Sequence, residues 1–360
     1  IAQCLVGSEM CIRDRIRVKD YSAISVMSGL KSLYLNSDII KDIGFIKGLP
    51  ALEDLTLEDT AVISLASLAE MPALRSLTLL GNNKVQDFGP VGTATGLTSL
   101  SIDKMTSQPD PDLSSLSGLE KLDIKGFMSI SSVRGLSGLK ELSIHNCNVD
   151  QADALSSLTG VERLTFYSVW NSQGNLRSLD FLKGMTGLKY ADFTGNLDGT
   201  GWSGYNYLVE VYGDVSSIFN HQGLEELYLD NGKFEINFDK IKENPGLRVL
   251  SLRNMELHKN YYVESYGGMT SVWYDDVKLG EHMDILSRFP NLEELYLDSN
   301  ELTDLNFAAG LKNLKRLGLK DNYITDLSPL KQAEFLEYLD IRDNPVGEVG
   351  DVGNGVEILQ

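Results

Sequence analysis

The sequence predicts an α/β solenoid, in which short repeats stack to form a concave parallel β-sheet backed by short 3₁₀ or irregular convex segments. An apolar pattern returns about every 22 residues from Leu30 onward, and within each repeat the apolar positions alternate as they do in a strand. The composition, 42% apolar and 23% charged, is that of a folded protein. A repeat also allows 360 residues to form one body instead of two or three globular domains.

Each repeat begins with the pattern apolar-x-x-apolar-x-apolar, as at Leu30, Leu33 and Leu35. The spacing is that of leucine-rich repeats, whose period is roughly 20 to 29 residues. We predict about 14 repeats, with an irregular stretch at 170–222. Their first apolar positions are Leu30, Leu52, Leu74, Leu97, Leu119, Leu139, Val161, Leu188, Leu224, Leu247, Met269, Leu292, Leu314 and Leu336.

The last two apolar positions of each pattern are predicted to lie on one side of a short strand, because side chains alternate along a strand. These side chains form the core, since a repeat buries them only against its neighbours. Between strands, apolar residues recur in steps of three, as at Ile40, Ile43 and Ile46. This spacing favours short 3₁₀ turns over full α-helices.

A turn position follows each strand, three residues after its last apolar side chain. We expect buried amides there to bond the backbone groups of the turn and to form a ladder along the stack. Cys147 occupies this position in its repeat and is predicted to be a buried substitute, facing away from His145. The asparagines at this position are Asn82, Asn196, Asn300, Asn322 and Asn344.

Two C-terminal repeats resemble the 22-residue repeats of internalin-like bacterial leucine-rich repeat proteins. The runs that carry the resemblance are LYLDSNELTDL at 295–305 and LGLKDNYITDLSPL at 317–330. The resemblance extends over roughly 30–344 and implies a horseshoe or arc scaffold that binds other proteins, often at a bacterial surface. Only five repeats keep the turn asparagine, so the resemblance supports the scaffold better than any particular ligand.

The two ends of the chain differ from the repeats. Residues 1–15 lack the period and resemble the translated read-through of a sequencing adapter, so we expect this segment to be non-native. Residues 16–360 are predicted to form a single leucine-rich repeat domain. Residues 356–359 resemble the opening of a further repeat, and we expect the chain to be a fragment at both ends.

The charge balance narrows the class of partner. A formal net charge of −19 and a pI near 4.6 argue against nucleic acid and anionic lipid, both of which need basic patches. No apolar run is long enough to insert into a membrane. Three cysteines are too few for a disulfide framework. The expected partner is therefore another protein.

The partner-binding surface is predicted on the concave sheet of the C-terminal half, where aromatic side chains occupy outward strand positions and carboxylates lie beside them. Exposed Tyr and Trp on a rigid sheet are typical of interface hot spots, and the carboxylates would favour a basic or polar partner. Taken singly, each residue is also a common sheet former. The predicted binding residues are Tyr190, Tyr228, Asp230, Trp273, Asp275, Tyr296 and Asp298.

A second candidate is the glycine-rich loop at 195–213, which contains Trp202, Tyr205 and Tyr207. Long loops on one face of a repeat protein are often binding elements, although a degenerate repeat or a self-packed bulge would give the same sequence. Residues 258–280 are similarly open between an insertion and a degenerate repeat. If this segment forms a hairpin, the strand position assigned to Trp273 fails.

The remaining motifs carry no chemistry that we can assign. The GxGxxG match at 199–204 lacks a βαβ context, so no nucleotide site is expected. The four histidines are scattered without metal-ligand spacing, and no GxSxG elbow occurs. We therefore predict no cofactor, no metal and no catalytic residue.

The sequence thus predicts an acidic, non-catalytic scaffold for protein–protein interaction, which acts as a bacterial surface or secreted recognition and adhesion module. Two alternatives remain open: an intracellular leucine-rich repeat regulatory scaffold in the cytoplasm, and a carbohydrate-binding surface protein. The sequence does not identify the partner, the compartment or the oligomeric state.

Overall fold

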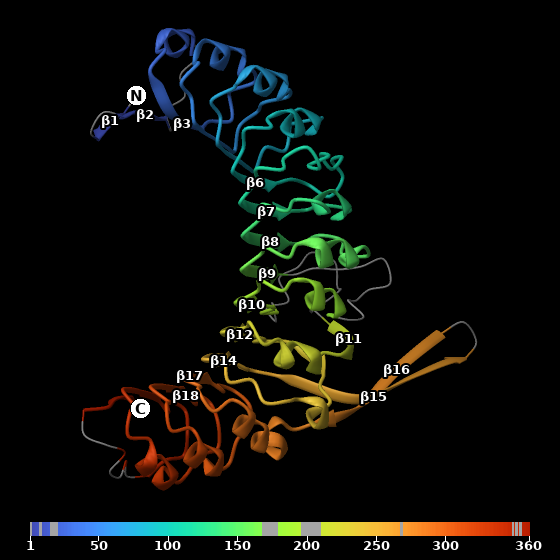
Figure 1. The fold of residues 1–360 in the computed structure, drawn as a ribbon, viewed down its shortest axis with the longest axis vertical. Coiled ribbons are helices and arrows are strands. Elements are labelled where there is room, and N and C mark those ends of the chain that lie inside the picture. The colour runs from blue at the N-terminus through green and yellow to red at the C-terminus, as the bar shows by residue number, and fades with distance from the viewer. Residues whose placement is uncertain are drawn as a thin grey trace. The chain divides into compact units, whose positions relative to one another are not determined.

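The computed structural model describes residues 2–6, 9–14, 21–167, 179–195, 210–266, 269–347, 349, 352 and 355–360. The chain divides into two compact units, unit 1 at 1–162 and unit 2 at 163–360. In both units, parallel strands alternate with short 3₁₀ segments (Figure 1). The predicted class of fold, a leucine-rich repeat solenoid, is confirmed for each unit.

The sheet of unit 1 consists of strands that pair with their sequence neighbours. Leu33 lies beside Leu55 on the next strand, and Leu55 lies beside Leu77 on the one after it, so the leucines keep one register. Two further strands form an antiparallel hairpin at the start of the unit, and the second of them pairs in parallel with β3. The strands are β1 (Ala2–Val6), β2 (Glu9–Asp14), β3 (Leu30–Asn36), β4 (Asp54–Glu58), β5 (Ser76–Leu80), β6 (Ser99–Asp103), β7 (Lys121–Lys125) and β8 (Glu141–His145).

The main sheet of unit 2 has the same parallel pairing, but most of its strands contain three residues. Its order is β9, β10, β12, β14, β17, β18, β19 and β20. The final strand pairs with β19, as expected for the opening of a further repeat at 356–359. The strands are β9 (Arg163–Tyr167), β10 (Tyr190–Asp192), β12 (Glu226–Tyr228), β14 (Val249–Ser251), β17 (Glu294–Tyr296), β18 (Arg316–Gly318), β19 (Tyr338–Asp340) and β20 (Glu357–Leu359).

Unit 2 also contains a second, four-stranded sheet of order β11, β13, β15 and β16. The central strand β13 pairs in parallel with β11 and β15, and β15 then turns back into β16 as an antiparallel hairpin. Figure 1 shows this hairpin extending away from the strands of the main sheet. The strands are β11 (Glu210–Asp214), β13 (Lys233–Glu235), β15 (Glu256–Tyr266) and β16 (Met269–Val277).

The hairpin corrects one predicted repeat. Met269, Val272 and Tyr274 were assigned to a strand of the parallel sheet, but β14 pairs directly with β17, and β16 belongs to the second sheet. The three-residue pattern occurs there because alternating apolar residues suit a hairpin as well as a repeat. Residues 258–277 are therefore an insertion between two repeats.

Short 3₁₀ segments connect the strands, as the three-residue spacing predicts. In the segment that contains Ile46, the N–H of Leu49 donates to the carbonyl of Ile46 over 2.9 Å. The segments are η1 (Ser22–Val26), η2 (Gly44–Gly48), η3 (Ala66–Glu70), η4 (Gly89–Thr93), η5 (Ser131–Val133), η6 (Ala152–Ser157), η7 (Asp180–Gly184), η8 (Ser216–Asn220), η9 (Phe238–Lys240), η10 (Leu279–Arg288), η11 (Asn306–Gly310) and η12 (Ser328–Gln332).

The core lies between the sheet and these segments. Strand leucines such as Leu55, Leu77 and Leu295 are at most 1% exposed, as are the apolar residues of the 3₁₀ turns Ile43 and Ile46. At about 25 cal/mol per Å² of buried apolar surface, the burial of these side chains is the main favourable term in folding.

Among the residues that the structure describes, no helix is long and apolar enough to cross a lipid bilayer.

The chain leaves many strands through a left-handed residue, two positions after the last strand apolar residue. Asn, Asp and Gly dominate this position because they tolerate positive φ. Gly126 has φ +79°, and a Cβ at this residue would lie 2.0 Å from the Lys104 carbonyl oxygen, so no other residue fits. The left-handed residues of this kind are Asp59, Gly81, Gly126, Asn146, Asn231, Asn254, Ser299, Asp321 and Asp343.

The predicted asparagine ladder is confirmed at the described positions. The Nδ2 of Asn322 donates to the carbonyls of Leu297 (3.0 Å) and Leu319 (2.9 Å). Its Oδ1 accepts the N–H groups of Asn300 (3.0 Å) and Leu302 (2.9 Å). Each amide thus links neighbouring repeats, and Asn82, Asn300 and Asn344 do the same. Asn196 lies outside the described residues.

Cys147 replaces asparagine in its repeat, as predicted. Its Sγ accepts the N–H of Phe127 over 3.4 Å and donates to the carbonyl of His145 over 3.1 Å. Burial raises the pKa of the thiol to about 12, so the group is neutral at physiological pH. The His145 ring instead lies beside Asp123 at 3.3 Å. Cys147 is therefore a structural residue.

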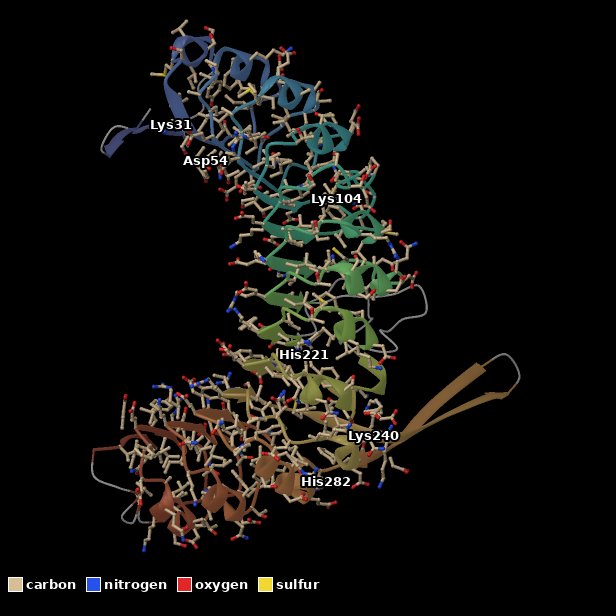
Figure 2. The ribbon with its side chains drawn as sticks, viewed as in Figure 1. Lys31, Asp54, Lys104, His221, Lys240 and His282 are labelled. Carbon is tan, nitrogen blue, oxygen red and sulfur yellow. The ribbon has the colours of Figure 1, made fainter. Side chains whose placement is uncertain are left out.

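Lys104 also bonds to buried carbonyl groups of the turns, a role that was not predicted from the sequence. Its ammonium is fully buried within unit 1 (Figure 2) and donates to the carbonyls of Gly126 (2.9 Å) and Gln108 (2.7 Å). It also pairs with Asp110 at 2.8 Å and lies 5.2 Å from the ring centroid of Phe127. Asp110 in turn accepts the N–H of Ser129 over 2.8 Å. The ion pair thus satisfies turn carbonyls that amides satisfy elsewhere.

Candidate binding face on unit 2

The outward side chains of the unit 2 main sheet form three rows, which together we call the unit 2 face. They lie on this face because every second residue of a strand points away from the leucine core. Row 1 contains Arg163, Tyr190, Glu226, Val249, Glu294, Arg316 and Tyr338; row 2 contains Thr165, Asp192, Tyr228, Ser251, Tyr296, Gly318 and Asp340; row 3 includes Asp230, Arg253, Asp298, Lys320 and Arg342.

Two predicted tyrosines form a continuous aromatic surface at one end of the face. The rings of Tyr190 and Tyr228 are 5.4 Å apart between centroids and tilted by 42°. The guanidinium of Arg163 lies 3.6 Å from the centroid of the Tyr190 ring, which is a cation–π geometry. All three side chains reach solvent. The surface is therefore rigid, aromatic and partly cationic.

Each of the three tyrosines donates its hydroxyl to a carboxylate on its own strand. Tyr190 donates to Asp192 (3.2 Å), Tyr228 donates to Glu226 (3.2 Å), and Tyr296 donates to Glu294 (2.6 Å), in each case two residues away. Burial, reinforced by these carboxylates, raises the pKa of all three phenols, that of Tyr190 to about 12. The tyrosines are therefore neutral hydrogen-bond donors with fixed rings.

The predicted carboxylates Asp230 and Asp298 are both bound by Arg253. Nη1 of Arg253 lies 3.1 Å from Asp230, and its Nε donates to Asp298 over 2.7 Å. Asp230 is 7% exposed and also accepts the hydroxyl of Ser251 over 2.5 Å. The guanidinium stacks on the Tyr296 ring, 4.2 Å from its centroid. These two acids therefore fix the face instead of offering free charge to a partner.

Glycine at position 318 shapes the face next to Tyr296. A Cβ at Gly318 would lie 2.9 Å from Cδ1 of Tyr296 and 3.0 Å from Oδ1 of Asp298. Such contacts are tighter than side chains ordinarily make. Because Gly318 has no side chain, the Tyr296 ring can occupy the space beside it.

The predicted position of Trp273 and Asp275 on this sheet is wrong. Both residues lie on β16, where Trp273 is the register partner of Tyr262 on β15, and Asp275 is that of Lys259. The hairpin that we considered as the alternative for this segment is the observed structure. The hairpin belongs to the second sheet, because residues 256–258 at the start of β15 pair in parallel with β13. The structure thus brings together Tyr190, Tyr228, Asp230, Tyr296 and Asp298, but not Trp273 or Asp275.

The second candidate, the loop with Trp202, Tyr205 and Tyr207, lies outside the described residues. The chain is described again from β11, which joins the second sheet beside β13. No group of three or more His, Cys, Asp or Glu side chains within the described ranges could hold a metal ion.

The stacking of arginines on the tyrosines of the face was not predicted from the sequence. Arg163, Arg253 and Arg316 each stack on a tyrosine ring, Arg316 at 4.2 Å from the centroid of Tyr338. Their tyrosine partners lie on neighbouring strands, 22 to 43 residues away in the chain. A comparison of equivalent positions in successive repeats could have found them, because every arginine lies in the same row as its partner or in the row next to it.

The class of protein follows from this architecture: each unit is a leucine-rich repeat solenoid with an open sheet face. The family model described as "Leucine Rich repeats (2 copies)" matches residues 290–332. This segment contains the two repeats that carry the internalin-like resemblance. No curated protein matches the chain.

The fold is internalin-like. An internalin from Listeria monocytogenes superposes with a TM-score of 0.66 at 20% identity, and the match covers 92% of this chain and 85% of that one. A leucine-rich repeat protein from Leptospira interrogans gives a TM-score of 0.61 at 17% identity, covering 93% and 85%. At these identities the similarity shows the fold alone. The predicted internalin-like repeat architecture is therefore confirmed.

Proposed function

We propose that this protein is a non-catalytic scaffold that binds another protein through the unit 2 face. The observation that carries the proposal is the set of half-buried tyrosines Tyr190, Tyr228 and Tyr296, held by arginine stacking and by hydrogen bonds to carboxylates. Aromatic and arginine side chains dominate the energetics of protein interfaces. Because these rings are already fixed in the unbound protein, they would lose little conformational entropy when a partner binds.

The charged groups of the face support binding over catalysis. Asp230 and Asp298 are occupied by Arg253, and Asp340 is bound by Arg342, with Nε at 2.9 Å. A general base or nucleophile needs an accessible group with a matched pKa. The tyrosines have pKa values raised away from neutrality, which suits donors of fixed hydrogen bonds.

We propose further that the protein acts at a bacterial surface or as a secreted recognition and adhesion module. Support comes from the internalin-like fold alone. Surface labelling of intact cells with a membrane-impermeant reagent tests this location, with a cytoplasmic protein as the internal standard. Exclusive recovery from the unlabelled fraction would favour the intracellular regulatory scaffold.

Site-specific photo-crosslinking tests the binding face. A photoreactive phenylalanine analogue is placed at Tyr228 or Tyr296 of the full chain, and at exposed Met128 of unit 1 as the matched control. We expect a discrete protein adduct from the two tyrosine positions and none from the control. Tyr228→Ala and Tyr296→Ala should each weaken capture of the crosslinked protein by more than about 1 kcal/mol. Adducts of equal yield from all three positions would contradict the proposal.

A further inference from the structure

Strand β14 lies between two strands of identical sequence. Residues 225–230 and 293–298 both read EELYLD, and the two segments pair with β14 from opposite sides in one register. The segments therefore form two equivalent walls, and the side chains of β14 form the floor between them. Adjacent strands are about 4.8 Å apart, so the walls are about 10 Å apart.

At the third row, this trough holds a guanidinium. Asp230 of one wall and Asp298 of the other face Arg253 on the floor, which bonds to both over 3.1 and 2.7 Å. A planar guanidinium can bridge two carboxylates because its N–H donors point in different directions. A guanidinium therefore fits between the two walls and can bond to a carboxylate on each of them.

At the first row, the same walls present two carboxylates without a cation between them. Glu226 and Glu294 lie on either side of Val249, whose apolar side chain is partly exposed. Each glutamate accepts one hydrogen bond from a tyrosine of its own strand and keeps further acceptor positions. Among the residues that the structure describes, neither glutamate forms an ion pair within 4 Å.

The charges around the first row are unequal. On the side of Glu294, the guanidinium of Arg316 on the neighbouring strand β18 interacts with its carboxylate. On the side of Glu226, the neighbouring residue in the row is Tyr190, which is uncharged, and the nearest cation in the row is Arg163 on the far side of that tyrosine, stacked on its ring. A cation that enters the trough would therefore meet negative charge that the protein compensates only in part.

We propose that an arginine side chain of the bound protein lies over Val249 and bridges Glu226 and Glu294. This inference rests on the proposed function, because it specifies the chemistry of the partner at the unit 2 face. Arginine is favoured over lysine because a guanidinium can bond to both carboxylates at once. The chain's own Arg253 does so at the third row of the same trough, and charge complementarity selects a basic segment.

Filling the trough from within provides the sharpest test. The variant Val249→Arg places a guanidinium between Glu226 and Glu294, as Arg253 lies between the two aspartates. Thr78→Arg is the matched control, since it adds the same guanidinium at an outward strand position of unit 1. Both variants should fold, because both side chains are partly exposed; circular dichroism and the thermal midpoint verify this.

Argininamide is the probe, and citrulline amide, which has the same shape without the charge, is its control. Binding to the full chain is followed by saturation-transfer NMR. We expect saturable binding of argininamide to the wild type and to Thr78→Arg, with little binding of citrulline amide. Val249→Arg should abolish it. The double variant Glu226→Gln with Glu294→Gln should weaken it about tenfold or more, equivalent to about 1.4 kcal/mol.

Equal binding of argininamide to the wild type and to Val249→Arg would overturn the inference, and so would the lack of saturable wild-type binding at tens of millimolar probe. The two proposals can fail separately. A protein crosslinked at Tyr228 whose capture is unaffected by Val249→Arg would leave the binding face intact and remove the arginine site. Binding of argininamide without any crosslinked protein would retain the site and count against the proposed function.

Discussion

The two units carry different chemistry on the same leucine framework. At the positions of unit 1 that correspond to row 2, the outward residues of successive strands are Tyr34, Thr56, Thr78, Ser101, Asp123 and Ser143, one tyrosine among smaller polar residues. Exposed ion pairs such as Lys125 with Asp103 connect the strands. In unit 2, the corresponding strands carry stacked tyrosines and arginines. Because core and surface residues alternate, either face can change without disturbing the leucines. A binding surface can therefore be confined to one unit.

The turn position differs between the units as well. Unit 2 keeps consecutive asparagines at 300, 322 and 344. Unit 1 has Asn82 and Cys147 at this position, and in another repeat it buries Lys104 one position earlier. All of these groups bond backbone atoms that would otherwise be buried without partners. The fold thus specifies the bonds that must be made, and several side chains can make them.

The largest effect is expected where unit 1 relies on a buried charge. Lys104→Met should destabilise the protein by about 3 to 5 kcal/mol, because Asp110 and the turn carbonyls lose their partner. Urea unfolding followed by circular dichroism measures the loss, and hydrogen exchange should locate it in unit 1. Lys125→Met, which breaks an exposed pair, is the control and should cost about 0 to 1 kcal/mol. A similar cost for both variants would show that the Lys104 pair is not structural.

The ladder of unit 2 should give the next largest effect. Asn322→Ala removes an amide that bonds to five backbone groups, and we expect a loss of about 2 to 3 kcal/mol in the free energy of unfolding. Asn313→Ala is the control, because its exposed amide bonds only to the carbonyl of Pro290 and the side chain of Asn291. Equal losses in the free energy of unfolding for the two variants would show that the asparagine ladder does not stabilise the turns.

A smaller effect is expected at the edge of the binding face. Gly318→Ala should cost about 1 kcal/mol in stability, because the added methyl group displaces the Tyr296 ring. Chemical shifts of the tyrosine rings should report the displacement. Gly310→Ala, where no atom lies within 4 Å of the added Cβ, should leave those shifts unchanged. Unchanged rings in both variants would mean that Gly318 does not shape the face.

The smallest effect at neutral pH is expected at Cys147, which should resist alkylation in the folded protein. Its folded pKa, about 12, is above its ordinary value of 9.0. The folded state therefore keeps a proton that the unfolded state loses, so the stabilisation is complete below pH 9 and decreases as pH rises toward 12. Cys147→Ser should reduce this slope in unfolding experiments between those pH values. Rapid labelling of the native thiol at pH 8 would disprove its burial.

The repeat was predictable because it depends on local sequence. Leucines two residues apart define strands, and steps of three define the 3₁₀ segments, so the order of elements and the turn asparagines followed directly. The pattern failed at Met269, Val272 and Tyr274 because a hairpin has the same alternation. Strand β16 has the alternation of a repeat strand, but it is longer and pairs in antiparallel with β15. Local sequence does not encode this pairing partner.

The sequence by itself determined the leucine core, the asparagine turns and which strand residues face solvent, since each follows from alternation within a repeat. The tertiary structure alone decided which neighbours those residues contact. It placed Arg253 between Asp230 and Asp298, stacked Arg163 on Tyr190, and moved Trp273 to a second sheet. The contacts of these arginines join residues 23 to 45 positions apart, and they depend on strand register and on inserted segments that no single repeat reveals.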